Sequence, residues 1–356
     1  MLFKSFPPVL KLNHMRRIIF TCLSLLAIHH AICQSNEVDR RSFFTDDRPI
    51  EVTLTTNIRD LVYNKKEPAF QKASIELRFP DSSAAIKEDI EVRPRGIFRK
   101  EHCNMASLML NFKTPGSPRL SSLKKLKFVG GCGKTRTDEQ NLIKEYLVYK
   151  MYNLFTEMSF KVRLMKVQYV DSRNKLKPYT QYAFVIEDVD DMAKRNGCLE
   201  KEGIAFNQEG TSRDHTTLVG IFQYMIANVD WSVPNYHNIK LLVPKKDTMA
   251  LPYVVPYDFD FCGLVNTEYA APPEKLNMQK VTDRLYRGFP RTMEEIQVVT
   301  NLFFKKKEQV LEVVNSCSFS ETKVKKQMTD FIEEFYDQIG NKKYLQANFI
   351  ENARKN

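Results

Sequence analysis

Polar side chains of the kinds that do chemistry gather in two short stretches of this sequence. The first stretch, DWSVPNYHN (residues 230–238), combines one carboxylate, two amides and an imidazole on a turn-forming segment: Asp230, Asn235, His237 and Asn238. The second stretch, YDFDFCG (257–263), sets Asp258 and Asp260 between aromatic residues. Carboxylate and amide oxygens are the hard ligands that Mg²⁺ and Mn²⁺ prefer. The two stretches together therefore predict a divalent-metal site.

The spacing of these residues indicates a particular reaction. In phosphoryl transfer, one Asp orients the acceptor hydroxyl, an Asn shortly after it holds a metal, and a second Asp holds the metal from another element. Asp230 is the predicted catalytic residue, and Asn235 follows it five positions later. The metal ligands then come from two pairs of alternatives: Asn235 or Asn238, and Asp258 or Asp260. The competing interpretation is that this segment is ordinary turn and cap chemistry, with His237 bracing the loop by a hydrogen bond.

The elements that must position these residues change type along the chain. The first half alternates apolar and polar residues, which predicts strands. We expect them at 50–58, 72–79, 89–97, 106–112, 124–131, 162–171 and 180–188, with a helix from Asp138 to Phe155 before the last two. From about Asp191 the three- and four-residue periodicity predicts helices, and a pair of short strands interrupts them. These helices are expected at 216–229, 292–315 and 320–339, and the short strands at 238–244 and 252–260.

This order predicts an α+β protein with a bilobal, protein-kinase-like fold. Residues 50–190 would form an N-terminal antiparallel β lobe with one long helix. Residues 191–356 would form a mainly helical C-terminal lobe that holds a catalytic β-hairpin. No internal repeat or low-complexity linker separates the two, so they are expected to pack as one unit.

Several motifs resemble the spore-coat protein H (CotH) kinase family of secreted atypical kinases. They are RPRG (93–96), NLIKEYLVYKMY (141–152), YAFVIEDVDDM (182–192) with Glu187, NVDWSVPNYHN (228–238) and PYDFDFCG (256–263). The resemblance implies ATP as the nucleotide, Asp230 as the catalytic Asp, and Asn235 or Asn238 as the metal-binding Asn. It implies Asp258 as the metal-binding Asp, with Asp260 as the competitor. No glycine-rich phosphate loop is evident.

A kinase-like site also needs cations for the nucleotide phosphates. A strand Lys held by a helix Glu is the usual arrangement, for which we assign Lys127 and Glu145, with Lys113 and Glu139 as alternatives. Arg93 and Arg95 should share one face of their strand, because side chains alternate, and could bind phosphate in bidentate fashion. Glu187 completes the predicted nucleotide-binding set. The competing interpretation is that these are solvated surface charges.

The N-terminus has the layout of a secretory signal peptide. In residues 15–33, Arg16 and Arg17 precede an apolar run too short to span a bilayer, and small residues follow near Ala31. Residues 1–33 are therefore assigned to the signal, with residues 1–14 as an extension before the true start. We expect an exported protein, periplasmic or extracellular, without a transmembrane segment. A lipoprotein acylated at Cys33 is the less favoured alternative.

Composition leaves the partners open. The net charge of +11 permits attraction to phosphates, but acidic residues are interspersed everywhere. We expect a monomer that binds a nucleotide and a protein or glycan acceptor, and no nucleic acid. A bridge between Cys103 and Cys132 is conceivable in an oxidising compartment, but buried free thiols are the favoured interpretation. Two rival functions remain: a glycosyltransferase that binds metal through Asp258-Phe259-Asp260, and a non-catalytic binding protein. A metal-dependent phosphohydrolase is disfavoured, because the chain has only six histidines.

Overall fold

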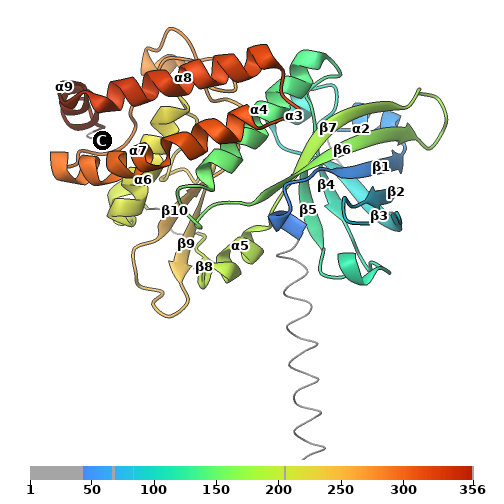
Figure 1. The fold of residues 1–356 in the computed structure, drawn as a ribbon. Helices are drawn as coiled ribbons and strands as arrows, with labels where there is room; N and C mark the ends of the chain where they lie inside the picture. The colour runs from blue at the N-terminus through green and yellow to red at the C-terminus, as the bar shows by residue number, and fades with distance from the viewer. Residues whose placement is uncertain (1–42, 66–68, 83, 204–205, 355–356) are drawn as a thin grey trace, which may run out of the picture.

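Seven strands from the first half of the chain close into a barrel (Figure 1). The structure, a computed structural model, describes residues 43–65, 69–82, 84–203 and 206–354. The barrel order is β1-β2-β3-β4-β5-β7-β6, and a parallel pairing of β1 with β6 closes it. The strands are β1 (Ile50–Thr56), β2 (Gln71–Arg78), β3 (Ile86–Arg95), β4 (Ser107–Asn111), β5 (Lys125–Val129), β6 (Val162–Asp171) and β7 (Tyr179–Ile186). The predicted signal peptide and Cys33 lie outside the described residues.

The closed barrel overturns the predicted fold. The elements are an α+β mix, but a bilobal, protein-kinase-like fold with an antiparallel β lobe is wrong. Ile50 of β1 lies opposite Met165 of β6, and this parallel ladder continues to Thr56 and Asp171. Alternating apolar residues show which side of a strand faces a core, but not whether the two end strands of a sheet meet. The pairing that closes the barrel joins segments more than a hundred residues apart in the sequence. The alternation of apolar and polar residues within each segment therefore could not predict it.

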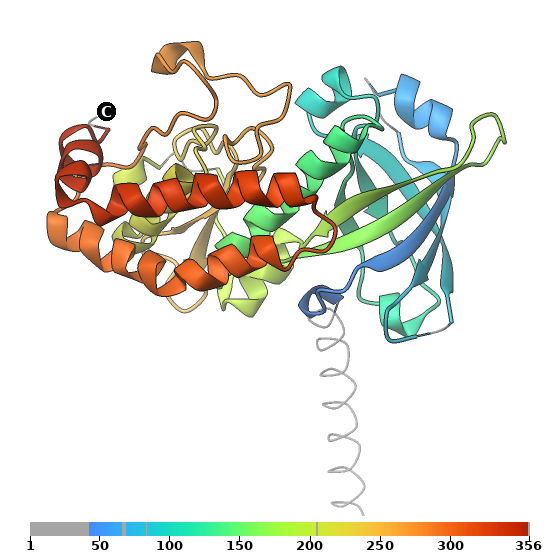
Figure 2. The ribbon, with the colours of Figure 1, turned by 45° about the horizontal axis from the view of Figure 1, so that its top comes forward.

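Helix α4 (Arg136–Tyr152) connects the barrel to the rest of the molecule. Thr135 and Asp138 form a capping box at its start, which satisfies backbone donors that the helix itself cannot. The helix packs against β7 on one side and against α7 on the other, as its position between the two regions in Figure 2 shows. Most residues of α4 are buried, and the polar side chains of Gln140 and Glu145 are among them.

The second half of the chain is mainly helical around a small antiparallel sheet of order β10-β9-β8. The strands are β8 (Cys198–Glu200), β9 (Ile239–Pro244) and β10 (Tyr253–Pro256). The helices are α5 (Val189–Arg195), α6 (Arg213–Met225), α7 (Met293–Asn315), α8 (Thr322–Gly340) and α9 (Lys342–Leu345). Two short helices of the barrel region, α2 (Ile58–Tyr63) and α3 (Phe98–His102), were not predicted because they are too short to show a period.

The cysteines differ from the favoured interpretation at one point. Cys103 and Cys132 form a disulfide that joins the residue after α3 to the loop after β5. Free thiols were therefore the wrong prediction for this pair. Cys198, Cys262 and Cys317 are free and buried, as expected.

Candidate functional site

A cavity of about 430 Å³ lies where the barrel meets the helical region. Its size falls in the range of sites that bind small molecules. Its polar lining includes Arg99, His237 and six further residues with potential for chemistry: Arg95, Lys127, Asp230, Asn238, Asp258 and Asp260. All six were predicted from the sequence, and they come from the barrel, from the 230–238 loop and from the segment after β10.

The β9–β10 hairpin brings the two acidic stretches together. Ile239, the first residue of β9, pairs with Pro256, the last residue of β10. The Tyr257 backbone N–H donates to the Asn238 carbonyl at 3.0 Å and extends this pairing by one residue. Asn238 and Asp258 therefore stand at the same end of the hairpin, although twenty positions separate them in the sequence.

The Asp230 carboxylate is held from two sides within its loop. His237 Nε2 lies 2.7 Å from one carboxylate oxygen, and Asn238 Nδ2 donates to the other at 2.9 Å. Asn238 Nδ2 also donates to the Asp230 carbonyl, while the Asp230 N–H donates to Asn228 Oδ1. These contacts fix the direction of the carboxylate at the edge of the cavity. Asn238 Oδ1 accepts no hydrogen bond in the described part of the chain and is left for another partner.

Asn235 does not join this group. It is exposed and is absent from the residues that line the cavity. The five-residue spacing from Asp230 pointed to Asn235, but the pairing of Ser232 with His237 turns the loop so that Asn238 meets Asp230 instead. Of the two amides that the sequence left open, only Asn238 is placed to act with Asp230.

Asp258 and Asp260 differ in what surrounds them. Asp258 has a φ of 63°, a left-handed conformation that is uncommon for residues other than glycine. Its backbone N–H donates to Tyr149 Oη at 2.8 Å, and its carboxylate, exposed to the cavity, accepts no hydrogen bond from any described residue. Strained backbone of this kind concentrates at functional sites. Asp258 is therefore available to bind a ligand of the cavity.

Asp260, in contrast, is already bound by protein groups through one of its carboxylate oxygens. It is buried, and its Oδ2 accepts hydrogen bonds from Arg99 Nε at 3.1 Å and from the Tyr269 hydroxyl at 2.8 Å. The Asp260 carbonyl accepts a further bond from the Thr267 hydroxyl. The Arg99 guanidinium already neutralises Asp260, whereas the Asp258 carboxylate has no such partner among the described residues, so Asp258 is the better ligand of the pair.

Arg99 is the residue that sequence reasoning missed. Its Nη2 lies 2.9 Å from Glu145 Oε2, and its Nη1 donates to the Gly130 carbonyl at 2.8 Å. Glu145 thus has a cation partner, but that partner is Arg99 and not the predicted Lys127. The only signal in the sequence was the position of Arg99 within RPRGIFRK, three residues after Gly96. The helix that carries Arg99 is too short to show a period, so the sequence pattern could not distinguish this arginine from an ordinary surface residue.

Lys127 and Arg95 face the cavity as cations without acidic partners. Lys127 Nζ lies 5.7 Å from the ring centroids of both Phe160 and Tyr257, and no carboxylate of the described residues pairs with it. Burial, followed by the charge of Arg95, lowers the pKa of Lys127. Two neighbouring positive charges of this kind complement a phosphate group.

Three further predicted residues lie elsewhere. The Arg93 guanidinium stacks over the Phe70 ring, 4.6 Å from its centroid. Of β3 and the residue after it, only Arg95 and Gly96 line the cavity, so Arg93 lies outside it. The alternatives to Lys127 and Glu145 are also outside the cavity. Lys113 pairs with Glu91 at 2.6 Å, and Glu139 pairs with Arg136 on the surface of α4.

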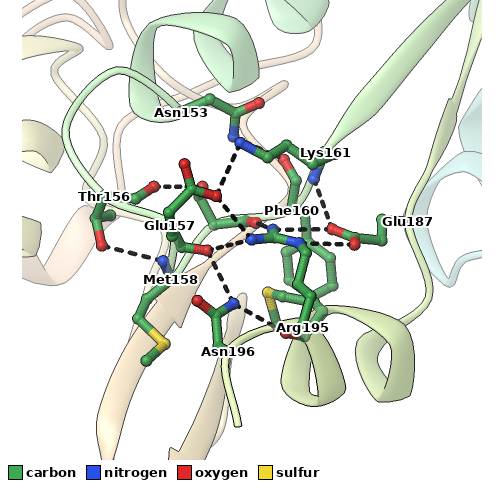
Figure 3. Close-up of polar contacts among 11 residues, drawn as sticks. Asn153, Thr156, Glu157, Met158, Phe160, Lys161, Glu187, Arg195 and Asn196 are labelled. Atoms are coloured by element: carbon green, nitrogen blue, oxygen red, sulfur yellow. Dashed lines mark hydrogen bonds and ion pairs between the residues drawn. The ribbon is translucent and has the colours of Figure 1, made fainter. Parts of the chain in front are cut away.

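Glu187 is a structural residue between the barrel and α5 (Figure 3). Arg195 donates from Nε and Nη2 to its two carboxylate oxygens at 2.9 and 3.0 Å, and the Lys161 N–H donates to one of them. Arg195 Nη1 also donates to the Glu157 carbonyl. Glu187 does not line the cavity, so the structure does not bring it to the other predicted nucleotide-binding residues.

Replacing Arg195 with Ala is expected to lower the free energy of unfolding by about 3 kcal/mol, because the buried Glu187 carboxylate loses its partner. Chemical denaturation measures the change. The matched control is Lys326→Ala, which breaks an exposed pair with Asp330 on α8 and should change stability far less. Equal effects of the two substitutions would contradict the structural role of Glu187.

The free groups of the cavity fit a divalent cation. The Asp258 carboxylate and Asn238 Oδ1 are hard oxygen ligands, and Mg²⁺ commonly takes only one or two protein ligands beside water and phosphate. Among the described residues, no three His, Cys, Asp or Glu side chains surround a common point as a metal-only cage would require. A metal here would therefore be completed by a bound ligand.

The pKa of Asp258 would make the binding of a metal to this carboxylate sensitive to pH. Although the side chain is open to the cavity, the protein atoms packed around it separate the carboxylate from bulk water and raise its pKa to about 6. The nearby Asp260 carboxylate adds to this effect, and Arg99 and Arg95 oppose it. A metal needs the ionised carboxylate, so affinity for Mn²⁺ should fall about tenfold per pH unit below that pKa and level off above it. Water-proton relaxation with Mn²⁺ between pH 5 and pH 8, roughly the range that brackets the pKa, measures this. Asp258→Asn should give a flat profile, and a flat profile in the unsubstituted protein would contradict the assignment.

Comparison with known proteins identifies no relative of this chain: no family model, no curated protein and no solved structure matches it. Within the described ranges, every helix is too short or too polar to cross a bilayer.

Proposed function

We propose that this chain is a metal-dependent phosphotransferase that uses a nucleotide bound to Mg²⁺ or Mn²⁺, with ATP as the phosphoryl donor. The observation that carries the proposal is the Asp258 carboxylate, held on strained backbone in a cavity that also contains the cations of Lys127 and Arg95. Among the described residues, neither the carboxylate nor these two cations has an ion-pair partner. The spacing and resemblance of the motifs to the spore-coat protein H kinase family support the same reaction. The proposal concerns the chemistry of the site and does not depend on a kinase-like fold.

Six residues of the cavity have roles in the proposed reaction. Lys127 and Arg95 bind the phosphates, and Asp258 and Asn238 Oδ1 hold the metal. The metal, when bound, neutralises charge on the phosphates. Asp230 orients the acceptor hydroxyl and accepts its proton, and His237 keeps the carboxylate pointed in one direction.

The acceptor and the location are part of the proposal. A hydroxyl of a protein or a glycan is the proposed acceptor, because Asp230 lies at the cavity edge and is about one-third exposed (33%). Export to the periplasm or the exterior is supported by the signal-like N-terminus and by the Cys103–Cys132 disulfide, since disulfides persist mainly in oxidising compartments.

One rival function loses support from the site. A glycosyltransferase with an Asp-x-Asp metal site uses both carboxylates, but Asp260 is already bound by Arg99 and Tyr269. A non-catalytic nucleotide-binding protein remains the alternative that experiment must separate.

The test uses the mature protein, labelled ATP and either Mg²⁺ or Mn²⁺. Binding is measured by calorimetry and transfer by label in a protein or glycan acceptor mixture, beside Asp258→Ala. We expect metal-dependent binding and transfer that Asp258→Ala abolishes. Binding without transfer would favour the non-catalytic alternative, and absence of nucleotide binding in the unsubstituted protein would overturn the proposal.

A further inference from the structure

The segment after β3 forms one wall of the cavity and includes only a short helix. β3 ends at Arg95, Gly96 follows with a φ of 83°, and α3 begins at Phe98. This helix has five residues, no side-chain cap and no fully buried side chain. A helix this short has little stability of its own, so the contacts at its two ends decide whether it stays in place.

Arg99 on this segment connects three separate parts of the site. Its guanidinium donates to Asp260 after β10, to Glu145 on α4 and to the Gly130 carbonyl after β5. Its side chain is only 11% exposed. Loss of this cation would leave two buried carboxylates unpaired, which is costly enough to rearrange the loops that carry them.

The Cys103–Cys132 disulfide anchors Arg99 from both sides. Cys103 directly follows α3, and its N–H donates to the Arg99 carbonyl at 3.2 Å. Cys132 lies two residues after Gly130, which accepts from the Arg99 guanidinium. The other contacts that hold this segment are the ring contacts of Phe98 with Phe261 and Tyr269, at centroid distances of 5.0 and 5.1 Å, and two hydrogen bonds. The hydrogen bonds run from the Asn104 N–H to the Cys132 carbonyl and from Lys65 Nζ to the Cys103 carbonyl.

We propose that Arg99 is a positioning residue for the cavity, and that the redox state of the Cys103–Cys132 disulfide controls whether Arg99 keeps its position. With the disulfide intact, Arg99 holds Asp260 and Glu145, which leaves Asp258 as the free carboxylate of the cavity. With the disulfide reduced, α3 loosens and the contacts of Arg99 are lost. The effect on nucleotide binding rests on the proposed function, whereas the effect on α3 does not.

The reduction is an ordinary thiol–disulfide exchange with an external dithiol. One thiolate of the dithiol attacks Cys132, which is more exposed than Cys103, and Cys103 leaves as a thiolate that takes up a proton. The second thiol of the dithiol then displaces Cys132 as a thiol and closes its own disulfide. Two electrons pass from the dithiol to the protein, and reoxidation reverses the change.

Hydrogen exchange of the full mature chain, oxidised and treated with dithiothreitol, tests the first part without nucleotide. We expect peptides covering residues 96–104 and 258–263 to exchange roughly tenfold faster after reduction, with β1, β2, α7 and α8 unchanged. Reoxidation should restore the slow rate. The double variant Cys103→Ser with Cys132→Ser is the matched control, and it should resemble the reduced protein and not respond to dithiothreitol.

Substitution of Arg99 tests whether the disulfide acts through this residue. We expect Arg99→Met to weaken Mg²⁺–ATP binding about as much as reduction does, and reduction of Arg99→Met to add little, because coupled residues are not additive. Arg99→Lys, which keeps the charge, should recover part of the affinity. A disulfide acting independently of Arg99 would instead give additive losses.

Each outcome decides the proposal. Unchanged exchange at 96–104 on reduction, unfolding of the whole protein on reduction, or additive losses would overturn it. If the local exchange appears as expected but neither form binds nucleotide, the proposed function fails while the control of α3 by the disulfide stands.

Discussion

Asp258→Asn is expected to weaken binding of Mg²⁺–ATP by about 100-fold, because it removes the charged ligand proposed for the metal. The fold should persist, since the Asp258 carboxylate has no hydrogen-bond partner among the described residues to lose. Asn also tolerates the left-handed backbone that this position requires. Calorimetry at fixed Mg²⁺ measures the affinity, and thermal unfolding measures the stability.

Asp260→Asn is the matched control, two residues away. It removes a charge held by Arg99 and Tyr269, so its main effect should be on stability. If Asp258→Asn binds Mg²⁺–ATP normally, or if it destabilises the protein as much as Asp260→Asn does, the metal assignment is wrong.

Asp230→Asn is expected to lower turnover by on the order of 10²-fold or more while nucleotide affinity barely changes. The reason is that Asp230 acts on the acceptor hydroxyl, and the amide cannot accept its proton. Single-turnover transfer and nucleotide binding, measured on the same preparation, separate the two effects.

His237→Gln is the control for the loop itself. A glutamine can still donate a hydrogen bond to Asp230, so turnover should fall less than in Asp230→Asn. Full transfer activity in Asp230→Asn would make Asp230 a spectator. Unfolding of that variant would make it a structural cap of the loop that Asn228 and Asn238 build.

Together the two substitutions distinguish binding from catalysis at one cavity. Asp258→Asn should impair both nucleotide binding and transfer, whereas Asp230→Asn should impair transfer alone. A protein that only binds nucleotide would show the first loss and no transfer in any form. The pair of experiments therefore tests the reaction as well as the residue roles.

The sequence by itself determined the local elements and several of the charged and amide residues of the cavity. The predicted strands and long helices are present, because period-two and period-3.6 patterns report which face of an element is buried. The hairpin from Ile239 to Pro256 and the acidic stretches at its ends were visible in the same way. Asp230, Asn238, Asp258 and Lys127 were all named from residue type and spacing, and the structure places them together.

Only the tertiary structure decided how those pieces meet. Barrel closure between β1 and β6, the disulfide, and the pairing of Glu145 with Arg99 all join segments distant in sequence. The choice of Asp258 over Asp260 depended on which carboxylate a distant guanidinium had already neutralised. Patterns along a chain record the faces of single elements, whereas these features depend on which faces of different elements come into contact. For that reason the candidate site residues could be named from the sequence, while the partner of each charge could not.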